Sequence, residues 1–488
     1  MRLLWLRRVV VGALVLLVSA LIFATHHRWV LTHFSSDGYL EDSGWLAYLF
    51  GSADPLLHNP SGVNGLSFYA HHLSPHIWLF GAPLAKVFGL SGFEILAWHQ
   101  GLFFALFFVS CCLIAARAGL SRRDQFIAAA SAALIGALSN ALFQAAGYPH
   151  YEIATIALTS LAIGAWFAGY ARLFVLCLIW LPLVREDGGF YVAVACLACV
   201  AIEGGHEPPL RSHTRRLVVL ALAGVGASAA SFLSKAWFFP GFDAFAHNFS
   251  GQLWNHVTVP FLVERGGAML QNLNIAPVLV GCAVLSAFDV RYATGLLLLS
   301  PLYLLHVLAI RPEHGHFTLY FALPWLLPPV IWLAVFVRRA RMSQAAFSEG
   351  AFLLAAALAL SAPIQAAAGA RGNSWYVATW AFARPVVNIE DMQDYLRWVR
   401  RDAPAIASGL NAHEHRQCMS QGIAALIPNE IRPVEVLTPD ADLHACQIVF
   451  LLRGEMYYST FTERAEAAGL TPAGGRRNVE MWLMTRRR

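Results

Sequence analysis

The stretch that decides the fold is FEILAWHQGLFFALFFVSCCLIAA, residues 93–116. It carries one charged side chain, Glu94, and is longer than the ~20 residues that an α-helix needs to cross a bilayer. Similar apolar runs recur up to about residue 370, and they are continuous rather than alternating. Continuous runs favour spanning helices over barrel strands. The sequence therefore predicts an all-α polytopic membrane protein.

The composition agrees with this class. Of the 488 residues, 58% are hydrophobic and only 13% are charged. The net charge of +5 does not indicate a nucleic-acid partner, because membrane topology explains the basic excess. Arginine outnumbers lysine heavily, which is typical of a GC-rich prokaryotic genome. We therefore expect a bacterial cytoplasmic (inner) membrane protein with membrane lipids as partners.

The apolar runs predict about 11 transmembrane helices. Their approximate ranges are 9–28, 93–116, 125–147, 153–171, 172–184, 188–203, 216–239, 272–289, 292–310, 317–337 and 347–369. The segment 77–88 is short, and we expect a juxtamembrane or re-entrant helix there. The first run is expected to be a signal anchor rather than a cleaved signal peptide.

The arginines predict the orientation. Arg2, Arg7 and Arg8 place the N-terminus in the cytoplasm by the positive-inside rule. Alternating from there, the other arginines before residue 371 fall in cytoplasmic loops, with four exceptions: Arg28, Arg185, Arg265 and Arg311. The scheme puts the C-terminal segment outside the cytoplasm.

A polar, acidic, histidine-rich loop, residues 33–76, follows the first run. It contains Asp37, Glu41 and Asp42 near its start and His71 and His72 near its end. Spanning helices are usually joined by short turns, so a loop of this size indicates a site on one membrane face.

The triplet Arg185-Glu186-Asp187 joins two short apolar runs and is expected at the bottom of an outer cavity. Charges at that depth are costly unless they are paired or hydrated. A binding role and a purely structural ion pair that pins two helix ends are both open interpretations.

A second outer turn lies in AIRPEHGHFTLYFALPW, residues 309–325. Arg311, His314, His316 and Tyr320 sit at the start of a helix there, and the H-x-H spacing suits a metal or a phosphate as well as a solvated loop. A further outer turn, 148–152, is interpreted as aromatic anchoring at the interface. The loop 240–271 has apolar residues near helical spacing, which indicates an amphipathic helix at the interface. A cap over a lipid-substrate groove and a simple packed surface helix are both open interpretations.

Residues 371–488 are polar and charged, and they predict a small α/β domain outside the membrane. We expect strands at 405–409, 434–438, 447–454 and 479–486, and helices at 388–401, 414–426 and 459–468. Cys418 and Cys446 could form a disulfide in an oxidising compartment. No zinc pattern, P-loop, Rossmann fingerprint or nucleophile elbow appears.

This layout resembles the GT-C superfamily of integral membrane glycosyltransferases: one helix, a large outer loop with an early acid, many helices and an outer soluble domain. Three segments also resemble a prokaryotic polytopic family filed as a domain of unknown function: HHLSPHIWLFGAPL in the first loop, REDGGF, and the α/β tail. The resemblance implies a transmembrane domain over 1–370, with an extracytoplasmic domain over 371–488.

The resemblance implies transfer of a sugar from a polyprenyl-phosphate donor to a glycan or protein acceptor. It assigns Asp37 as the catalytic base, with Glu41 and Asp42 as alternatives. Arg185, Arg311, His314 and His316, or a divalent metal, would hold the leaving phosphate. The alternatives are a transporter or flippase and a non-catalytic membrane protein.

Overall fold

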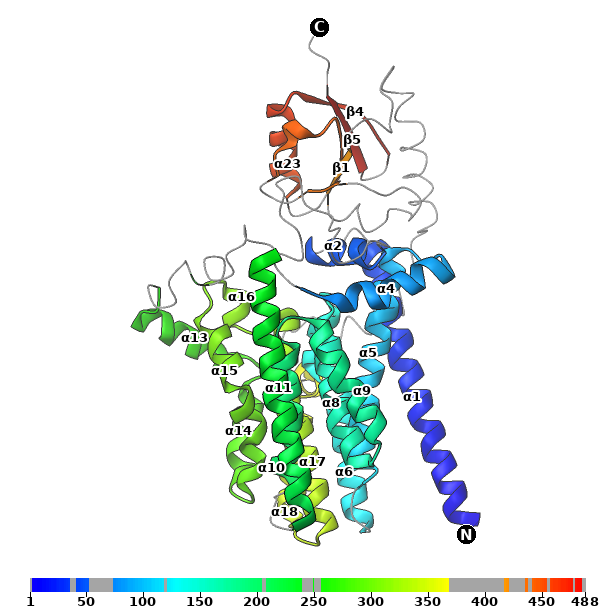
Figure 1. Cartoon of the computed structure of the whole chain (residues 1–488), viewed down its shortest axis with the longest axis vertical. Coiled ribbons are helices and arrows are strands. Elements are labelled where there is room, and N and C mark those ends of the chain that lie inside the picture. The colour runs from blue at the N-terminus through cyan, green and yellow to red at the C-terminus, as the bar shows by residue number, and fades with distance from the viewer. Residues whose placement is uncertain are drawn as a thin grey trace. The chain divides into compact units, whose positions relative to one another are not determined.

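A computed structural model gives the fold (Figure 1) and describes residues 2–35, 41–51, 73–117, 121–203, 208–238, 249, 256–367, 417–420, 435–437, 441–453, 457–476 and 479–484. The described chain is mostly helical and has a small sheet near its C-terminal end. It divides into two compact units. The first comprises residues 1–26, 100–234 and 243–380, and the second comprises 27–99, 235–242 and 381–488.

The α-helices before the tail are α1 (Arg2–Ser35), α2 (Glu41–Phe50), α4 (Pro75–Phe88), α5 (Gly92–Ala115), α6 (Arg122–Ala137), α7 (Asn140–Ala146), α8 (Glu152–Ala168), α9 (Ala171–Val184), α10 (Gly188–Glu203), α11 (Pro208–Phe238), α13 (Val259–Gln271), α14 (Ala276–Ser286), α15 (Thr294–Leu308), α16 (Pro312–Gly315), α17 (Leu327–Arg341), α18 (Phe347–Ala359) and α19 (Ala362–Ala367). Two 3₁₀ helices, η1 (Val290–Ala293) and η2 (Leu319–Leu326), precede α15 and α17. In the first unit, helices α8, α10, α11, α14, α15 and α17 run side by side as a bundle (Figure 1).

Within the described residues, five helical segments are long and apolar enough to cross a membrane, or six if one bent pair counts as a span. They are Val9–Leu31, Gly92–Ala115, His213–Lys235, Val290–Leu308 and Leu319–Arg341, with Val259–Gln271 and Ala276–Ser286 as the bent pair. These helices support a multi-pass membrane protein by length and composition. Helix α4 spans only 14 residues and is shorter than this group.

The prediction of 11 spans was therefore too high. Residues 153–171, 172–184 and 188–203 form helices α8, α9 and α10, each of 17 residues or fewer. Helix α8 ends at Gly169, which takes the left-handed conformation (φ 77°) that glycine adopts without strain. The runs 125–147 and 347–369 each break into two helices, which leaves each piece too short.

The two broken runs pair at their breaks. Asn140 donates its backbone N–H to the carbonyl of Leu360 (2.9 Å), and Ala362 donates to Leu138 (2.8 Å). Ser139 and Ser361 form an antiparallel bridge between them. Backbone N–H and C=O groups freed by a helix break need hydrogen-bond partners away from water, and here the two breaks supply them to each other.

Helices α10 and α11 approach closely through glycine. A Cβ atom at Gly189 would lie 2.0 Å from the carbonyl oxygen of Gly224, and one at Gly224 would lie 2.5 Å from that of Gly189. Phe190 also donates its backbone N–H to the Ser228 hydroxyl on α11 (3.0 Å). Small residues that let helix backbones meet are typical of membrane helix pairs.

In the second unit, a buried histidine pair joins α4 to the first half of α5. The Nε2 atoms of His76 and His99 lie 2.8 Å apart, and both side chains are fully buried. Phe50 and Phe80 pack against both rings. Burial lowers the pKa of His76 to about 3, so its ring is neutral at physiological pH.

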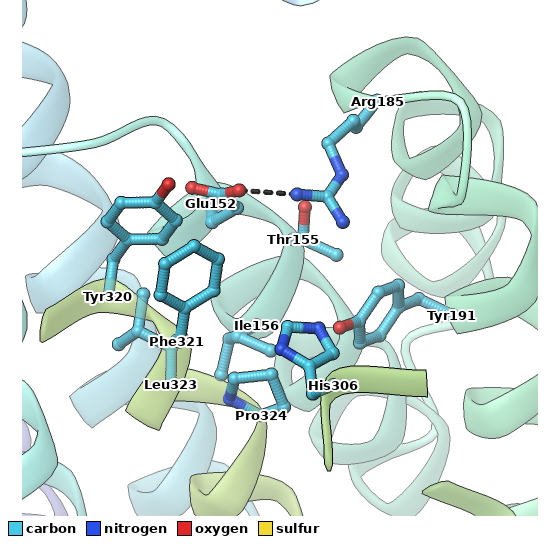
Figure 2. Close-up of a pocket in the computed structure, with 10 residues that line it drawn as sticks. All are labelled: Glu152, Thr155, Ile156, Arg185, Tyr191, His306, Tyr320, Phe321, Leu323 and Pro324. Carbon is cyan, nitrogen blue, oxygen red and sulfur yellow. Dashed lines mark hydrogen bonds and ion pairs between the residues drawn. The ribbon is translucent and has the colours of Figure 1, made fainter. Parts of the chain in front are cut away.

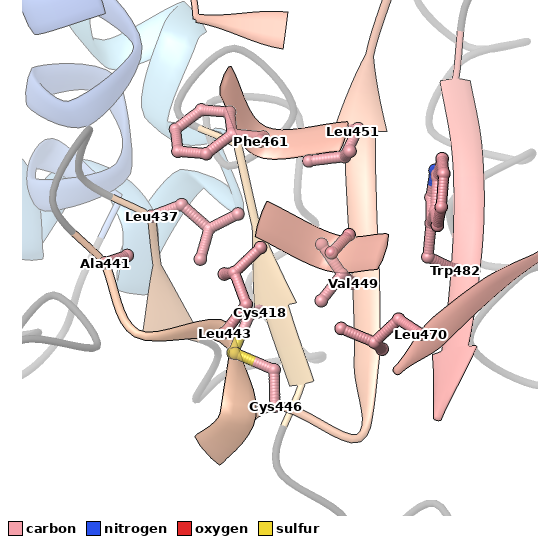
Figure 3. Packing of buried hydrophobic residues seen from close by; sticks show 11 residues of the cluster. Cys418, Leu437, Ala441, Leu443, Cys446, Val449, Leu451, Phe461, Leu470 and Trp482 are labelled. Atoms are coloured by element: carbon pink, nitrogen blue, oxygen red, sulfur yellow. A yellow bond between two sulfur atoms is a disulfide. The ribbon is translucent and has the colours of Figure 1, made fainter. Parts of the chain in front are cut away.

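The tail forms a five-stranded sheet of order β2-β1-β3-β5-β4. Its elements are β1 (Gln417–Met419), β2 (Glu435–Val436), η4 (Leu443–Ala445), β3 (Ile448–Leu452), α23 (Tyr458–Ala467), β4 (Leu470–Arg476) and β5 (Val479–Met484). The β1–β2 and β1–β3 pairs are parallel, whereas β3–β5 and β4–β5 are antiparallel. Figure 3 shows the core of this sheet, where Val449, Leu451, Phe461 and Trp482 pack together.

Several tail predictions are confirmed, and one is wrong. The strands at 434–438, 447–454 and 479–486 and the helix at 459–468 appear as β2, β3, β5 and α23. The helix at 414–426 is wrong where it is described, because Gln417–Met419 is a buried strand between β2 and β3. Strand β4 was missed, and the predictions for 388–401 and 405–409 lie outside the described residues.

Cys418 and Cys446 form a disulfide in this core, with Cα atoms 5.9 Å apart (Figure 3). It links β1 to the turn before β3. The six other cysteines are free and buried or half-buried, including Cys196 and Cys199 on α10.

Candidate functional site

An ion cluster lies where α8 begins and α9 ends. Arg185 follows the last residue of α9, and its Nε and Nη2 atoms donate to the two carboxylate oxygens of Asp187 (2.8 and 2.5 Å). Its Nη1 donates to the carboxylate of Glu152, the first residue of α8. A carboxylate in the first turn also favours the positive end of the helix dipole. The guanidinium therefore has a partner on every nitrogen, and its one positive charge faces two carboxylates.

Aromatic rings back this cluster. The Nδ1 atom of His150 contacts the Glu152 carboxylate, and its ring stacks on Tyr320 with centroids 4.1 Å apart and planes 7° apart. Gln100 fixes the turn by donating to the His150 carbonyl (2.6 Å). Burial raises the pKa of the neighbouring Tyr151 hydroxyl well above its ordinary value, so that group stays protonated.

A pocket opens beside the cluster, as Figure 2 shows. The empty space within it is about 320 Å³, which includes space open to solvent. It draws its walls from α8, α10, α15 and η2 and from the residue that ends α9: Glu152, Thr155, Ile156, Arg185, Tyr191, His306, Tyr320, Phe321, Leu323 and Pro324. Polar and aromatic side chains thus meet at the ends of otherwise apolar helices.

Apart from the Glu152 oxygen that pairs with His150, two polar atoms at this pocket lack hydrogen-bond partners among the described residues. They are the Thr155 hydroxyl and the Nδ1 atom of His306, and both atoms are buried. Thr155 as a whole is only 2% exposed. A buried polar atom without a partner costs free energy of about 1–3 kcal/mol, so a bound group that hydrogen-bonds to these atoms would be stabilised.

The turn between α15 and η2 forms the far wall. Its backbone is held by Arg265 on α13, whose Nη2 donates to the carbonyls of Ala309 (3.2 Å) and Ile310 (3.0 Å). Phe317 and Leu319 have positive φ values of 51° and 55°, which non-glycine residues adopt only at an energetic cost. Such strain often accompanies functional sites, and this strained segment presents Tyr320 and Phe321 to the pocket.

The structure brings some of the sequence-predicted site residues together. Arg185 and Tyr320 line the same pocket, Asp187 pairs with Arg185, and Glu186 is buried beside them (4% exposed). Arg185 thus pairs with Asp187, as the interpretation of the triplet as a structural ion pair expects. Arg185 also donates to Glu152 on another helix.

The other predicted residues of the 309–325 stretch do not line the pocket. His316 binds Glu264 through Nε2 (2.5 Å), and the His314 ring packs on Phe321 with centroids 4.1 Å apart. Arg311 is exposed at the start of α16. His314 and His316 thus contact different neighbours.

The first-loop candidates cannot be compared in the same way. Asp37, His71 and His72 lie outside the described residues. Glu41 and Asp42 begin helix α2, but their side chains also lie outside what the structure describes. Their proposed roles stay predictions. Among the described residues, no group of three or more metal-ligating side chains comes together.

Sequence reasoning missed the inner walls of the pocket, namely Thr155, Tyr191 and His306. The available signal was a polar side chain within an apolar run, which in membrane proteins often marks a site. The turn 148–152, interpreted as interfacial anchoring, instead contributes His150 and Glu152 to the ion cluster.

No family model matches the chain, and no curated protein sequence matches it. The resemblance to a domain of unknown function therefore has no support from a family model. Among solved structures, the cryo-EM structure of the arabinofuranosyltransferase AftD from mycobacteria is similar, with a TM-score of 0.49 and 14% sequence identity. The match covers 95% of this chain and 40% of that protein, so this chain spans well under half its length.

Proposed function

We propose that this chain is an integral membrane glycosyltransferase that moves a sugar from a polyprenyl-phosphate donor to an acceptor hydroxyl. The observation that carries the proposal is the pocket beside Glu152 and Arg185. It combines hydroxyl, imidazole and carboxylate groups with aromatic rings at the ends of apolar helices. A substrate with a hydrophilic sugar and a long lipid tail suits both parts of that arrangement.

The charge balance of the pocket favours the sugar rather than the phosphate as its occupant. Arg185 already binds Asp187 and Glu152, so it has little remaining capacity to hold an anion. The atoms left without hydrogen-bond partners, the Thr155 hydroxyl and the Nδ1 atom of His306, are suited to bind sugar hydroxyls. Because part of this space is open to solvent, we infer that a single hydroxyl of the sugar enters it and that the ring packs on the aromatic wall.

The phosphate then needs another cation, and Arg311 is the candidate because it is exposed at the start of α16. A divalent metal is the alternative. The catalytic base is proposed to be Asp37, Glu41 or Asp42 in the first loop. It would take the proton of the acceptor hydroxyl while that oxygen bonds to the anomeric carbon, and the carbon–oxygen bond to phosphate breaks to release polyprenyl phosphate.

The test is transfer from a panel of radiolabelled polyprenyl-phosphate sugars by purified full-length protein in lipid nanodiscs. We expect one donor to react, Asp37→Asn to lower the rate at least 100-fold, and Thr155→Val to raise the donor KM about 10-fold. Ser160→Ala is the matched control, because it removes a buried hydroxyl from the same helix away from the pocket. Absence of transfer from every donor would reject the proposal.

The helix breaks favour a second candidate, a transporter or flippase of a lipid-linked sugar. Discontinuous helices are typical of transporter substrate sites. Here, Asn140 and Asn274 bind each other through Nδ2 and Oδ1 (3.1 Å), and Asn274 also donates to Gln144 (2.8 Å). This amide cluster carries no charge, and its side chains satisfy one another, so we rank it second. Movement of a fluorescent lipid-linked sugar across proteoliposomes without chemical transfer would favour the transporter.

A further inference from the structure

Helix α13 carries a row of exposed apolar side chains. Val259, Leu262, Val263 and Leu270 are 74%, 45%, 68% and 69% exposed. Their spacing of three, four, seven and eleven residues places them on one face of the helix. Gly266 lies on the same face, and a Cβ atom there would meet nothing within 4 Å. This open face is the apolar face of α13.

The other side of α13 carries Arg265, which is turned against the protein, and Glu264, which is half exposed. Arg265 is only 2% exposed and donates to the carbonyls of Ala309 and Ile310, while its guanidinium also lies 4.9 Å from the centre of the Phe261 ring. Glu264 binds His316. A helix packed on a water-exposed surface would bury its apolar side. This helix holds its cation inside and leaves its apolar face open.

The direction of α13 fits a position along a membrane surface. Its axis is bent by 78° from α14, and only the four residues 272–275 separate the two helices. Helix α14 and the spanning helix α15 expose apolar residues of their own, Val280 (63%) and Leu297 (66%). Figure 1 shows α13 leaving the bundle sideways while α14 and α15 run along it.

We propose that α13 lies in the boundary between phospholipid headgroups and acyl chains, with its apolar face on the acyl chains. Continuity with the outward residues of α14 and α15 identifies the bilayer as the occupant of this face. The apolar face of such a helix reaches about 5–10 Å into the boundary between headgroups and acyl chains. Through Arg265, the same helix holds the 309–317 turn, so the wall of the pocket has a fixed height relative to the membrane surface.

The experiment places a nitroxide spin label at Val263→Cys in full-length protein, one copy per phospholipid nanodisc. Collision rates with oxygen, which concentrates in lipid, and with a water-soluble nickel chelate give the depth of the label. Val280→Cys on α14 is the deep control, and the exposed position Ala467→Cys on α23 is the aqueous control. The parent chain without an added cysteine is treated with the same spin label, to show that its native cysteines do not react.

We expect the Val263 label to prefer oxygen over the chelate, at a depth between the two controls. A collision ratio equal to that of Ala467 would place α13 in water and overturn the proposal. A depth equal to that of Val280 would make α13 part of a span and would also overturn it. Shielding from both reagents would indicate a protein partner or a second copy on this face, and it would overturn the proposal as well.

Discussion

At the scale of single residues, the Arg185 ion cluster decides how the ends of α8, α9 and α10 meet. The side chains of Arg185, Glu152 and Asp187 are 17%, 12% and 14% exposed, so water screens them only in part. Removing one partner of such a cluster leaves the remaining charges unpaired, which is more harmful than removing a surface charge.

We therefore predict that Arg185→Leu destabilises the protein by about 3 kcal/mol. The two remaining carboxylates would repel each other in a poorly solvated place. Adding Asp187→Asn should recover part of this loss, because one negative charge is removed. Thermal unfolding in nanodiscs measures both. Arg172→Leu, an exposed arginine at the start of the same helix α9, should change the midpoint little. Equal midpoints for Arg185→Leu and Arg172→Leu would contradict the prediction.

The residue scale also shows how far sequence reasoning reached at the site. The triplet 185–187 could be identified because three adjacent charges interrupt an apolar stretch. Its partner Glu152 could not be assigned, since the pair is separated by 33 positions and depends on how α8 packs on α9. Thr155 was hidden for a different reason: a lone hydroxyl in an apolar helix normally binds its own backbone.

At the scale of helices and strands, the sequence predicted where apolar segments lie better than where helices end. The run 125–147 is mostly apolar, and no proline marks the break after Ala137, although the polar pair Ser139-Asn140 lies there. The break is held by hydrogen bonds to a segment more than 200 positions away, at Leu360 and Ala362. Local sequence cannot specify such a partner. In the tail, β1 was missed as a strand because its pairing with β2 and β3 is also non-local.

The close contact of α10 and α11 gives a prediction at this scale. Gly189→Ala should destabilise the helix pair by about 2 kcal/mol or more, because its Cβ would lie 2.0 Å from a backbone oxygen that cannot move alone. Gly226→Ala on α11 is the matched control: nothing lies within 4 Å of its Cβ, and alanine favours a helix. Thermal unfolding of the two variants in nanodiscs compares them. A midpoint for Gly189→Ala at or above that of Gly226→Ala would refute close packing.

At the scale of the whole molecule, the arginine pattern predicts one orientation for the chain, with the N-terminus in the cytoplasm and the tail outside. The Cys418–Cys446 disulfide agrees with an oxidising compartment for the tail. The orientation itself depends on the parity of the spans rather than on their number. Five spans and six spans put the tail on opposite sides of the membrane, so the orientation is tested directly.

That test uses two single-cysteine probes on segments expected on opposite sides of the membrane. Arg122→Cys lies exposed at the start of α6, in a loop assigned to the cytoplasm, and Ala467→Cys lies exposed on α23 in the tail. A membrane-impermeant maleimide added to intact bacterial cells with a permeable outer envelope should label Ala467→Cys and leave Arg122→Cys unlabelled until the inner membrane is opened. The native cysteines are buried, half-buried or disulfide-bonded, so the parent chain should give a low background. The reverse pattern would place the tail in the cytoplasm. It would also remove the reason to expect lipid-linked donors, because a site on that side could draw on soluble nucleotide sugars directly.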